Sequence, residues 1–204
     1  MTSTQQYSRR RPRVRAGRLA LALTALAMAV IGTISVVQQL VPRPNAEVAS
    51  ASGVPDGAEG ADANGTWGLW DDAPVVTNLD PALLAALQEA AVAAESDGIT
   101  LRLTSGWRSA EYQQSLFDRA VQDYGSVDEA ERWVASPHRS AHVQGLAVDI
   151  ATTDAYSWLD QHGAAFGLCR TFANEGWHFE LREISGDGWC PDMLPDASAD
   201  PRRW

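Results

Sequence analysis

The segment SAHVQGLAVDI, residues 140–150, places one carboxylate inside an apolar alternation. Alternation along residues 146–150 is typical of a strand with one face in a core. An unpaired carboxylate is costly to bury, and Asp149 is tolerated in such a strand if it is paired or bound to a metal ion. His142 reaches the same point if the chain turns at Gly145. The segment therefore predicts two ligands of a divalent ion.

A second segment, NEGWH at residues 174–178, supplies a further histidine and an acid at the start of another predicted strand. Residues three apart on a regular strand point to opposite faces, so Gly176 is expected to provide an irregular turn that lets Glu175 and His178 converge. Two histidines and an aspartate that leave one position open are typical of a catalytic zinc site. Glu175 is then the candidate to accept a proton from water and pass it to a leaving amine.

Three ordered motifs carry a resemblance to a known family. S-x-H-x-x-G-x-A-x-D at residues 140–149, E-x-W-H at residues 175–178 and SGWRSAEYQ at residues 105–113 together resemble the VanY-type zinc D-alanyl-D-alanine carboxypeptidases, with Trp107 in place of a tyrosine. The resemblance extends over roughly residues 100–182.

The resemblance implies a set of site residues, namely the zinc ligands His142, Asp149 and His178, the catalytic base Glu175, the cleft arginine Arg108, and the polar substrate contacts Ser140 and Gln113. A guanidinium in the cleft pairs with a peptide carboxylate or with the oxyanion of the tetrahedral intermediate. The alternative for Arg108 is an ion pair that supports a loop. The alternative for Gln113 is a structural role inside a helix, without substrate contact. Trp177 is expected to pack and orient His178.

The implied function is a zinc-dependent peptidase that removes the terminal D-alanine from peptidoglycan stem peptides. D,D-dipeptidase, L,D-carboxypeptidase or endopeptidase action on the same wall is a rival interpretation, and a non-catalytic peptidoglycan-binding domain is another. Gly176 replaces a proline that the family often has, and the chain between Phe166 and Glu175 is short. These departures predict a more open cleft and leave the choice of substrate undecided.

The N-terminal part predicts export. Six arginines in a basic cytoplasmic tail, residues 1–18, precede an uncharged run at residues 19–41 that is long enough to cross a bilayer. We expect a single-pass anchor in the cytoplasmic membrane with the catalytic domain outside, or a secreted protein if a signal peptidase cleaves at the small residues 49–51. Residues 42–65 lack large apolar side chains and predict a disordered linker.

Charge and cysteines add two constraints on the exported part. Residues 44–204 hold 9 basic and 26 acidic residues, which argues against nucleic acid as a partner. Cys169 and Cys190 are predicted to form a disulfide, because oxidation is permitted outside the cytoplasm; two separate buried thiols are the alternative.

The alternation and the helix caps predict an α+β domain at residues 66–192, built on a small, mainly antiparallel sheet with flanking helices, followed by a C-terminal tail at residues 193–204. Strands are expected near residues 99–103, 146–150 and 177–181. Helices are expected after the caps Asp80 and Ser109, after the capping box that starts at Ser126, and before Gly167.

Overall fold

A computed structural model describes residues 61–202 of the chain. The predicted cytoplasmic tail, the predicted membrane segment and most of the predicted linker lie outside these residues. Within the described part, every helix is too short or too polar to cross a bilayer. The membrane anchor therefore stays a prediction.

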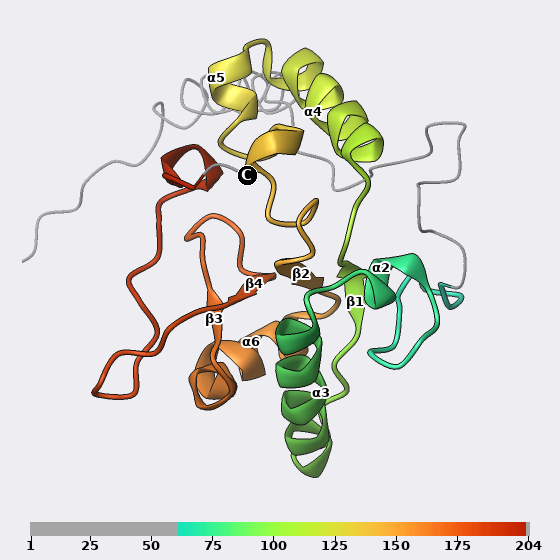
Figure 1. Ribbon diagram of the computed structural model, residues 1–204, viewed down its shortest axis with the longest axis vertical. Coiled ribbons are helices and arrows are strands. Elements are labelled where there is room, and N and C mark those ends of the chain that lie inside the picture. Colours follow the sequence, from blue (N-terminus) through green and yellow to red (C-terminus); the bar gives the residue numbers. More distant parts are fainter. Residues whose placement is uncertain (1–60, 203–204) are drawn as a thin grey trace, which may run out of the picture. The chain divides into compact units, whose positions relative to one another are not determined.

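One four-stranded antiparallel sheet with the order β1-β2-β4-β3 organises the domain (Figure 1). The strands are β1 (Leu103–Ser105), β2 (Ala147–Ile150), β3 (Leu168–Arg170) and β4 (His178–Leu181). The central pair β2 and β4 places Asp149 opposite His178. The predicted α+β class with a small antiparallel sheet is confirmed.

Helices surround this sheet, and their starts follow the predicted caps. They are α2 (Pro74–Thr77), α3 (Pro81–Ser96), α4 (Ala110–Tyr124), α5 (Val127–Ala130) and α6 (Thr153–His162), with short 3-10 helices η1 (Pro137–Arg139), η2 (Gly163–Phe166) and η3 (Ala197–Ala199). The Asp80 carboxylate accepts hydrogen bonds from the first turn of α3, and the Ser109 hydroxyl accepts one from the first turn of α4. These side chains satisfy backbone donors that have no partner within the helix.

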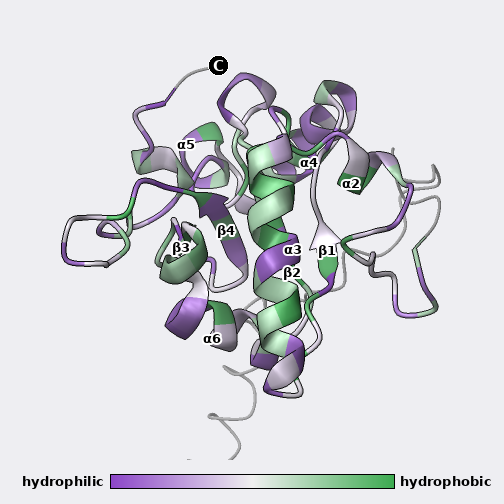
Figure 2. Cartoon of the chain, turned by 60° about the horizontal axis from the view of Figure 1, so that its bottom comes forward, coloured by the Kyte–Doolittle hydropathy of each residue, from purple (hydrophilic) through white to green (hydrophobic). Residues whose placement is uncertain are grey.

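Apolar side chains fill one face of the sheet. Figure 2 shows α3, which is largely hydrophobic, lying across the strands. Leu87 of α3, Val148 of β2 and Phe179 of β4 are completely buried there. Each such side chain stabilises the fold by roughly 2 kcal/mol, so a one-residue slip of either strand would lose several of these contributions. Because side chains alternate along a strand, this register fixes Asp149 and His178 on the opposite face.

Two strands differ from the prediction. Leu101 is buried, but the chain pairs with β2 only from Leu103 onward, so β1 begins later than the alternation indicates. The three-residue strand β3 was not predicted, because so short a segment gives no periodic signal. It follows Gly167, whose φ of 74° ends η2 in the left-handed conformation expected of a C-terminal cap.

The C-terminal residues pack against the domain instead of forming a tail. Cys169 and Cys190 are joined by a disulfide, the pairing that the sequence predicts. Leu194 forms an isolated parallel β-bridge with Phe172. Arg139 donates hydrogen bonds to the carbonyls of residues 197, 198 and 200. The domain therefore extends beyond the predicted boundary at residue 192.

Gly145 is expected to be the least replaceable residue of the turn before β2. Its φ is 70°, and a Cβ at this position would lie 2.4 Å from the carbonyl oxygen of Asn78. Gly145→Ala should lower the free energy of unfolding by about 3 kcal/mol, from left-handed strain plus the backbone clash. Gly98→Ala is the matched control, since Gly98 has a φ of 76° with open space around it; it should lose only about 1 kcal/mol. Equal losses in denaturant titrations would contradict the clash.

Candidate metal centre

His142 is held by the loop that follows β1. Its Nδ1 lies 2.8 Å from the carbonyl oxygen of Gly106. A carbonyl only accepts, so Nδ1 carries the proton and Nε2 presents its lone pair. Gly106 lies so close to α2 that a Cβ would approach the Val75 carbonyl oxygen to 2.2 Å. The glycine of the SGWR motif thus lets the backbone at residue 106 lie close to α2, and this places the Gly106 carbonyl beside His142.

Two consecutive tight turns bring Glu175 and His178 together. The amide of Glu175 bonds the carbonyl of Phe172, and the amide of His178 bonds the carbonyl of Glu175. His178 then opens β4 opposite Asp149. The Glu175 Oε2 lies 3.7 Å from the His178 Nδ1, so the convergence expected around Gly176 is present.

The three predicted ligand atoms form a nearly equilateral triangle. His142 Nε2 lies 3.3 Å from His178 Nδ1, and Asp149 Oδ1 lies 3.4 Å from each of these nitrogens. A tetrahedral site with ligand bonds of about 2.0–2.1 Å has edges of roughly 3.3–3.4 Å. Within residues 61–202, this is the group of His, Cys, Asp and Glu side chains with spacing suited to a metal ion.

The chemistry of the triangle also fits a cation. The Asp149 Oδ1 is buried and has no hydrogen-bond partner within the described residues. Burial by itself would raise the pKa of Asp149, but the neighbouring imidazoles and guanidinium hold it well below its usual range. The carboxylate is therefore ionised, and its inner oxygen faces two imidazole nitrogens. A divalent metal ion would satisfy all three donor atoms.

Glu180 supports His178 from behind, and sequence reasoning missed it. Its Oε1 lies 3.1 Å from the His178 Nε2, which therefore carries a proton and leaves Nδ1 for the triangle. Burial would raise the pKa of Glu180, but His178 and Arg202 lower it to about 2. The available signal was its position two residues after His178, on the same face of β4.

Arg108 and Gln113 belong to a hydrogen-bond network that includes Asp149. The Arg108 Nη2 donates to the Asp149 Oδ2 at 2.7 Å, and its Nη1 donates to the Gln113 Oε1 at 3.1 Å. Gln113 is 1% exposed and its amide nitrogen donates to the Ala135 carbonyl. In the structure Arg108 pairs with the predicted ligand Asp149, and Gln113 holds Arg108. Contact of either with substrate stays a prediction.

The remaining candidate residues take other positions. Ser140 is buried in the turn that leads to His142, and its substrate contact also stays a prediction. Trp177 is 42% exposed, and the packing expected of it against His178 stays a prediction. Phe172 packs against His178, with ring centroids 5.0 Å apart. An exposed tryptophan beside the site is free to contact a ligand.

Burial sets the electrostatics of Glu175. Its carboxyl is almost completely enclosed, which raises the pKa to about 7, although His178 opposes this shift. A carboxyl with a pKa near neutrality exchanges protons readily at physiological pH, as a general base requires. The site thus combines three side chains spaced to hold a metal ion with a neighbouring acid that can accept and return a proton.

Comparison with known proteins agrees with this geometry. Residues 76–183, just over half of the chain, match the family model VanY, described as D-alanyl-D-alanine carboxypeptidase. The chain belongs to this family. The match includes all four residues of the candidate centre.

Individual relatives are similar over shorter or comparable stretches. A D-alanyl-D-alanine carboxypeptidase of Enterococcus faecalis (strain ATCC 700802 / V583) is 35% identical over an alignment of 118 residues, and the match covers 46% of this chain and 44% of the relative. The chain thus spans less than half the length of that relative. A zinc-bound variant of the vancomycin-resistance D,D-pentapeptidase VanY is 32% identical over 52% of this chain and 73% of its own, with a TM-score of 0.48. VanYB with D-alanine-D-alanine shows the same identity and TM-score over 72% of its chain.

Metal binding is expected to release about one proton at pH 8. Burial lowers the pKa of His178, but the Asp149 and Glu180 carboxylates outweigh it and raise the pKa to about 10 in the metal-free protein. His178 is therefore doubly protonated at pH 8 and must lose the Nδ1 proton to bind a metal. Titration calorimetry in buffers of different ionisation enthalpy measures this proton. Affinity should fall about tenfold per unit as the pH drops from 9 to 8, and a pH-independent affinity would contradict the protonation described here.

Proposed function

We propose that the protein is a zinc-dependent D-alanyl-D-alanine carboxypeptidase that hydrolyses the terminal D-alanine of peptidoglycan stem peptides. The observation that carries this proposal is the triangle of His142, Asp149 and His178 with Glu175 beside it. Membership of the VanY family supports the choice of substrate class.

The donor set favours zinc. Two imidazole nitrogens and one carboxylate oxygen are ligands that zinc takes in catalytic sites, where three protein donors leave one position for the reaction. Cysteines are absent from the cluster and both are used in the disulfide. A bound ion supplies Lewis acidity, which polarises the scissile carbonyl and acidifies water to a pKa near 7.

Glu175 moves the proton. Its carboxylate stands 3.7 Å from the nearest ligand nitrogen, close enough to reach a water at the open side of the triangle. We assign it the transfer of a proton from the attacking water to the amine of the departing D-alanine. Its enclosure excludes bulk water, which would otherwise compete for this proton.

Arg108 stabilises negative charge at the reacting carbonyl. Three of its five N–H groups are used by Ser105, Gln113 and Asp149. Within residues 61–202, the other two have no hydrogen-bond partner, so they remain for an oxyanion or a peptide carboxylate. The three fixed hydrogen bonds preorganise the guanidinium, which lowers the cost of binding that charge.

We place the reaction outside the cytoplasmic membrane. The disulfide between Cys169 and Cys190 is stable in an oxidising compartment, and the predicted membrane segment would tether the domain there. The stem peptides of peptidoglycan are present in the same space.

The central test uses the full-length chain loaded with one zinc ion and a pentapeptide that ends in D-Ala-D-Ala. Release of free D-alanine, measured by mass spectrometry, is expected. Release of a dipeptide, or hydrolysis only of a tetrapeptide with an L,D bond, would assign a different wall peptidase activity. Binding of the peptide without hydrolysis at any pH would indicate a non-catalytic domain.

Glu175→Gln should lower kcat by about a thousandfold, because the amide cannot accept the proton, while zinc stays bound. Glu183→Gln is the matched control, since Glu183 is exposed and lies outside the cluster; it should keep full activity. Loss of zinc from the Glu175 variant would show that this residue is a ligand and not the base.

A further inference from the structure

The segment of residues 190–202, here named the C-terminal strap, crosses the back of the metal centre. The disulfide anchors the start of the strap, and Leu194 forms a β-bridge with Phe172. Further along, Asp196 pairs with Arg132 at 3.0 Å. The strap lies outside residues 76–183, the part of the chain that matches the family model. Its contacts with the site are therefore features of this chain that the family match does not describe.

The last third of the strap is hydrogen-bonded to the loop that carries His142. Arg139, three residues before this ligand, is 8% exposed in its side chain. Its Nη2 donates to the carbonyls of residues 197, 198 and 200 at 3.3, 2.9 and 3.1 Å, and its Nη1 pairs with Glu131. A buried guanidinium shared among these acceptors holds the strap and the His142 loop in one arrangement.

Arg202, the last residue of the strap, binds the carboxylate that contacts His178. The two terminal nitrogens of Arg202 contact the two oxygens of Glu180 at 2.5 and 2.9 Å, a bidentate pair. The Nε of Arg202 also donates hydrogen bonds to the carboxylate of Asp200. Glu180 is 1% exposed and accepts from the His178 Nε2. A continuous chain of contacts thus runs from the strap to a metal ligand.

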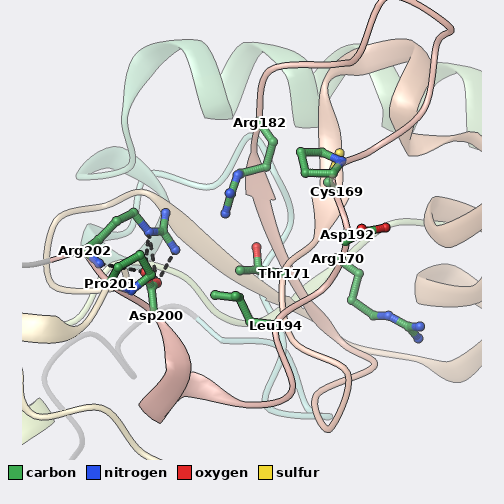
Figure 3. Close-up of a pocket in the computed structure, with 10 residues that line it drawn as sticks. Cys169, Arg170, Thr171, Arg182, Asp192, Leu194, Asp200, Pro201 and Arg202 are labelled. Atoms are coloured by element: carbon green, nitrogen blue, oxygen red, sulfur yellow. Dashed lines mark hydrogen bonds and ion pairs between the residues drawn. The ribbon is translucent and has the colours of Figure 1, made fainter.

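A cavity of about 170 Å³ separates the strap from the sheet in this region. Thr171 and Arg182 lie on the sheet side, and Leu194 and Arg202 lie on the strap side (Figure 3). Figure 3 also shows Asp200 and Arg202 side by side, joined by hydrogen bonds. Packed side chains do not fill the middle of this region, so the strap is held at the rim of the cavity by the disulfide, by the Leu194 bridge and by the bidentate contact of Arg202.

We propose that the C-terminal strap is part of the metal centre and that Arg202 is a positioning residue, which acts through Glu180 to hold the His178 ring with its Nδ1 toward the other ligands. The proposal rests on the proposed function, because it assumes that the triangle binds zinc. The Glu180 carboxylate fixes the proton on Nε2, and Arg202 fixes the carboxylate. Outer contacts of this kind commonly change metal affinity by 10–100-fold when they are removed.

Zinc affinity, measured on the full-length chain by competition with a chelator, tests the proposal without any substrate. Arg202→Gln should weaken binding by about 10–100-fold. Arg202→Lys, which keeps one charged contact, should recover part of this loss. The matched control is Arg170→Gln, because Arg170 lines the same cavity but bonds Met193 and pairs with Asp160 instead of Glu180. It should bind zinc as the unchanged protein does.

A double-mutant cycle with Glu180→Gln identifies the route of the effect. If Arg202 acts through Glu180, the double variant loses no more affinity than Glu180→Gln alone. The absorption bands of the cobalt-loaded protein should change in both single variants and stay unchanged in Arg170→Gln, whereas a purely structural role of Arg202 would lower the metal-free Tm and leave these bands in place.

Two results would overturn the proposal. Additive losses of affinity, or an unchanged zinc affinity of Arg202→Gln in a protein that binds zinc and releases D-alanine, would remove the strap from the metal centre but leave the proposed function intact. Failure of the unchanged protein to bind zinc would overturn both. Circular dichroism of each variant confirms that the comparison is made between folded proteins.

Discussion

The buried, ionised carboxylate of Asp149 is the constraint on which the rest of this structure depends. Its outer oxygen is neutralised by Arg108, but its inner oxygen faces two imidazole nitrogens and has no hydrogen-bond partner within residues 61–202. In the metal-free protein the protonated His178 ring lies 3.4 Å from this oxygen and compensates its charge. A divalent ion would take the place of that proton and satisfy all three donor atoms, so the geometry fits a cation.

Each ligand of this centre is held from behind by a different part of the chain. A backbone carbonyl holds His142, a guanidinium holds Asp149, and a second carboxylate holds His178. The helices on the far face of the sheet fix the register that aligns Asp149 with His178. Preorganisation of this kind lowers the free-energy cost of assembling the ligands. More of the free energy of metal binding would then stabilise the folded protein.

The sequence could predict the ligands because a histidine or an acid at a strand edge interrupts an apolar pattern, as Asp149 does. The caps Asp80 and Ser109 could also be predicted, because each bonds to the helix that directly follows it in the sequence. Arg202 could not be predicted in this way, because it lies 22 residues from its partner Glu180, in a polar segment that resembles a solvated tail. The packing of Phe172 against the His178 ring was not predicted either, because the two residues belong to different elements.

X-ray absorption spectroscopy of the zinc-loaded protein tests the central claim most directly, because it reports the ligands of the ion whatever the substrate proves to be. The account predicts a first shell of about four nitrogen or oxygen atoms at about 2.0–2.1 Å, with the multiple scattering of two imidazoles and no sulfur. A first shell that contains sulfur, or fewer than two imidazoles, would place the ion elsewhere and contradict a centre built from His142, Asp149 and His178.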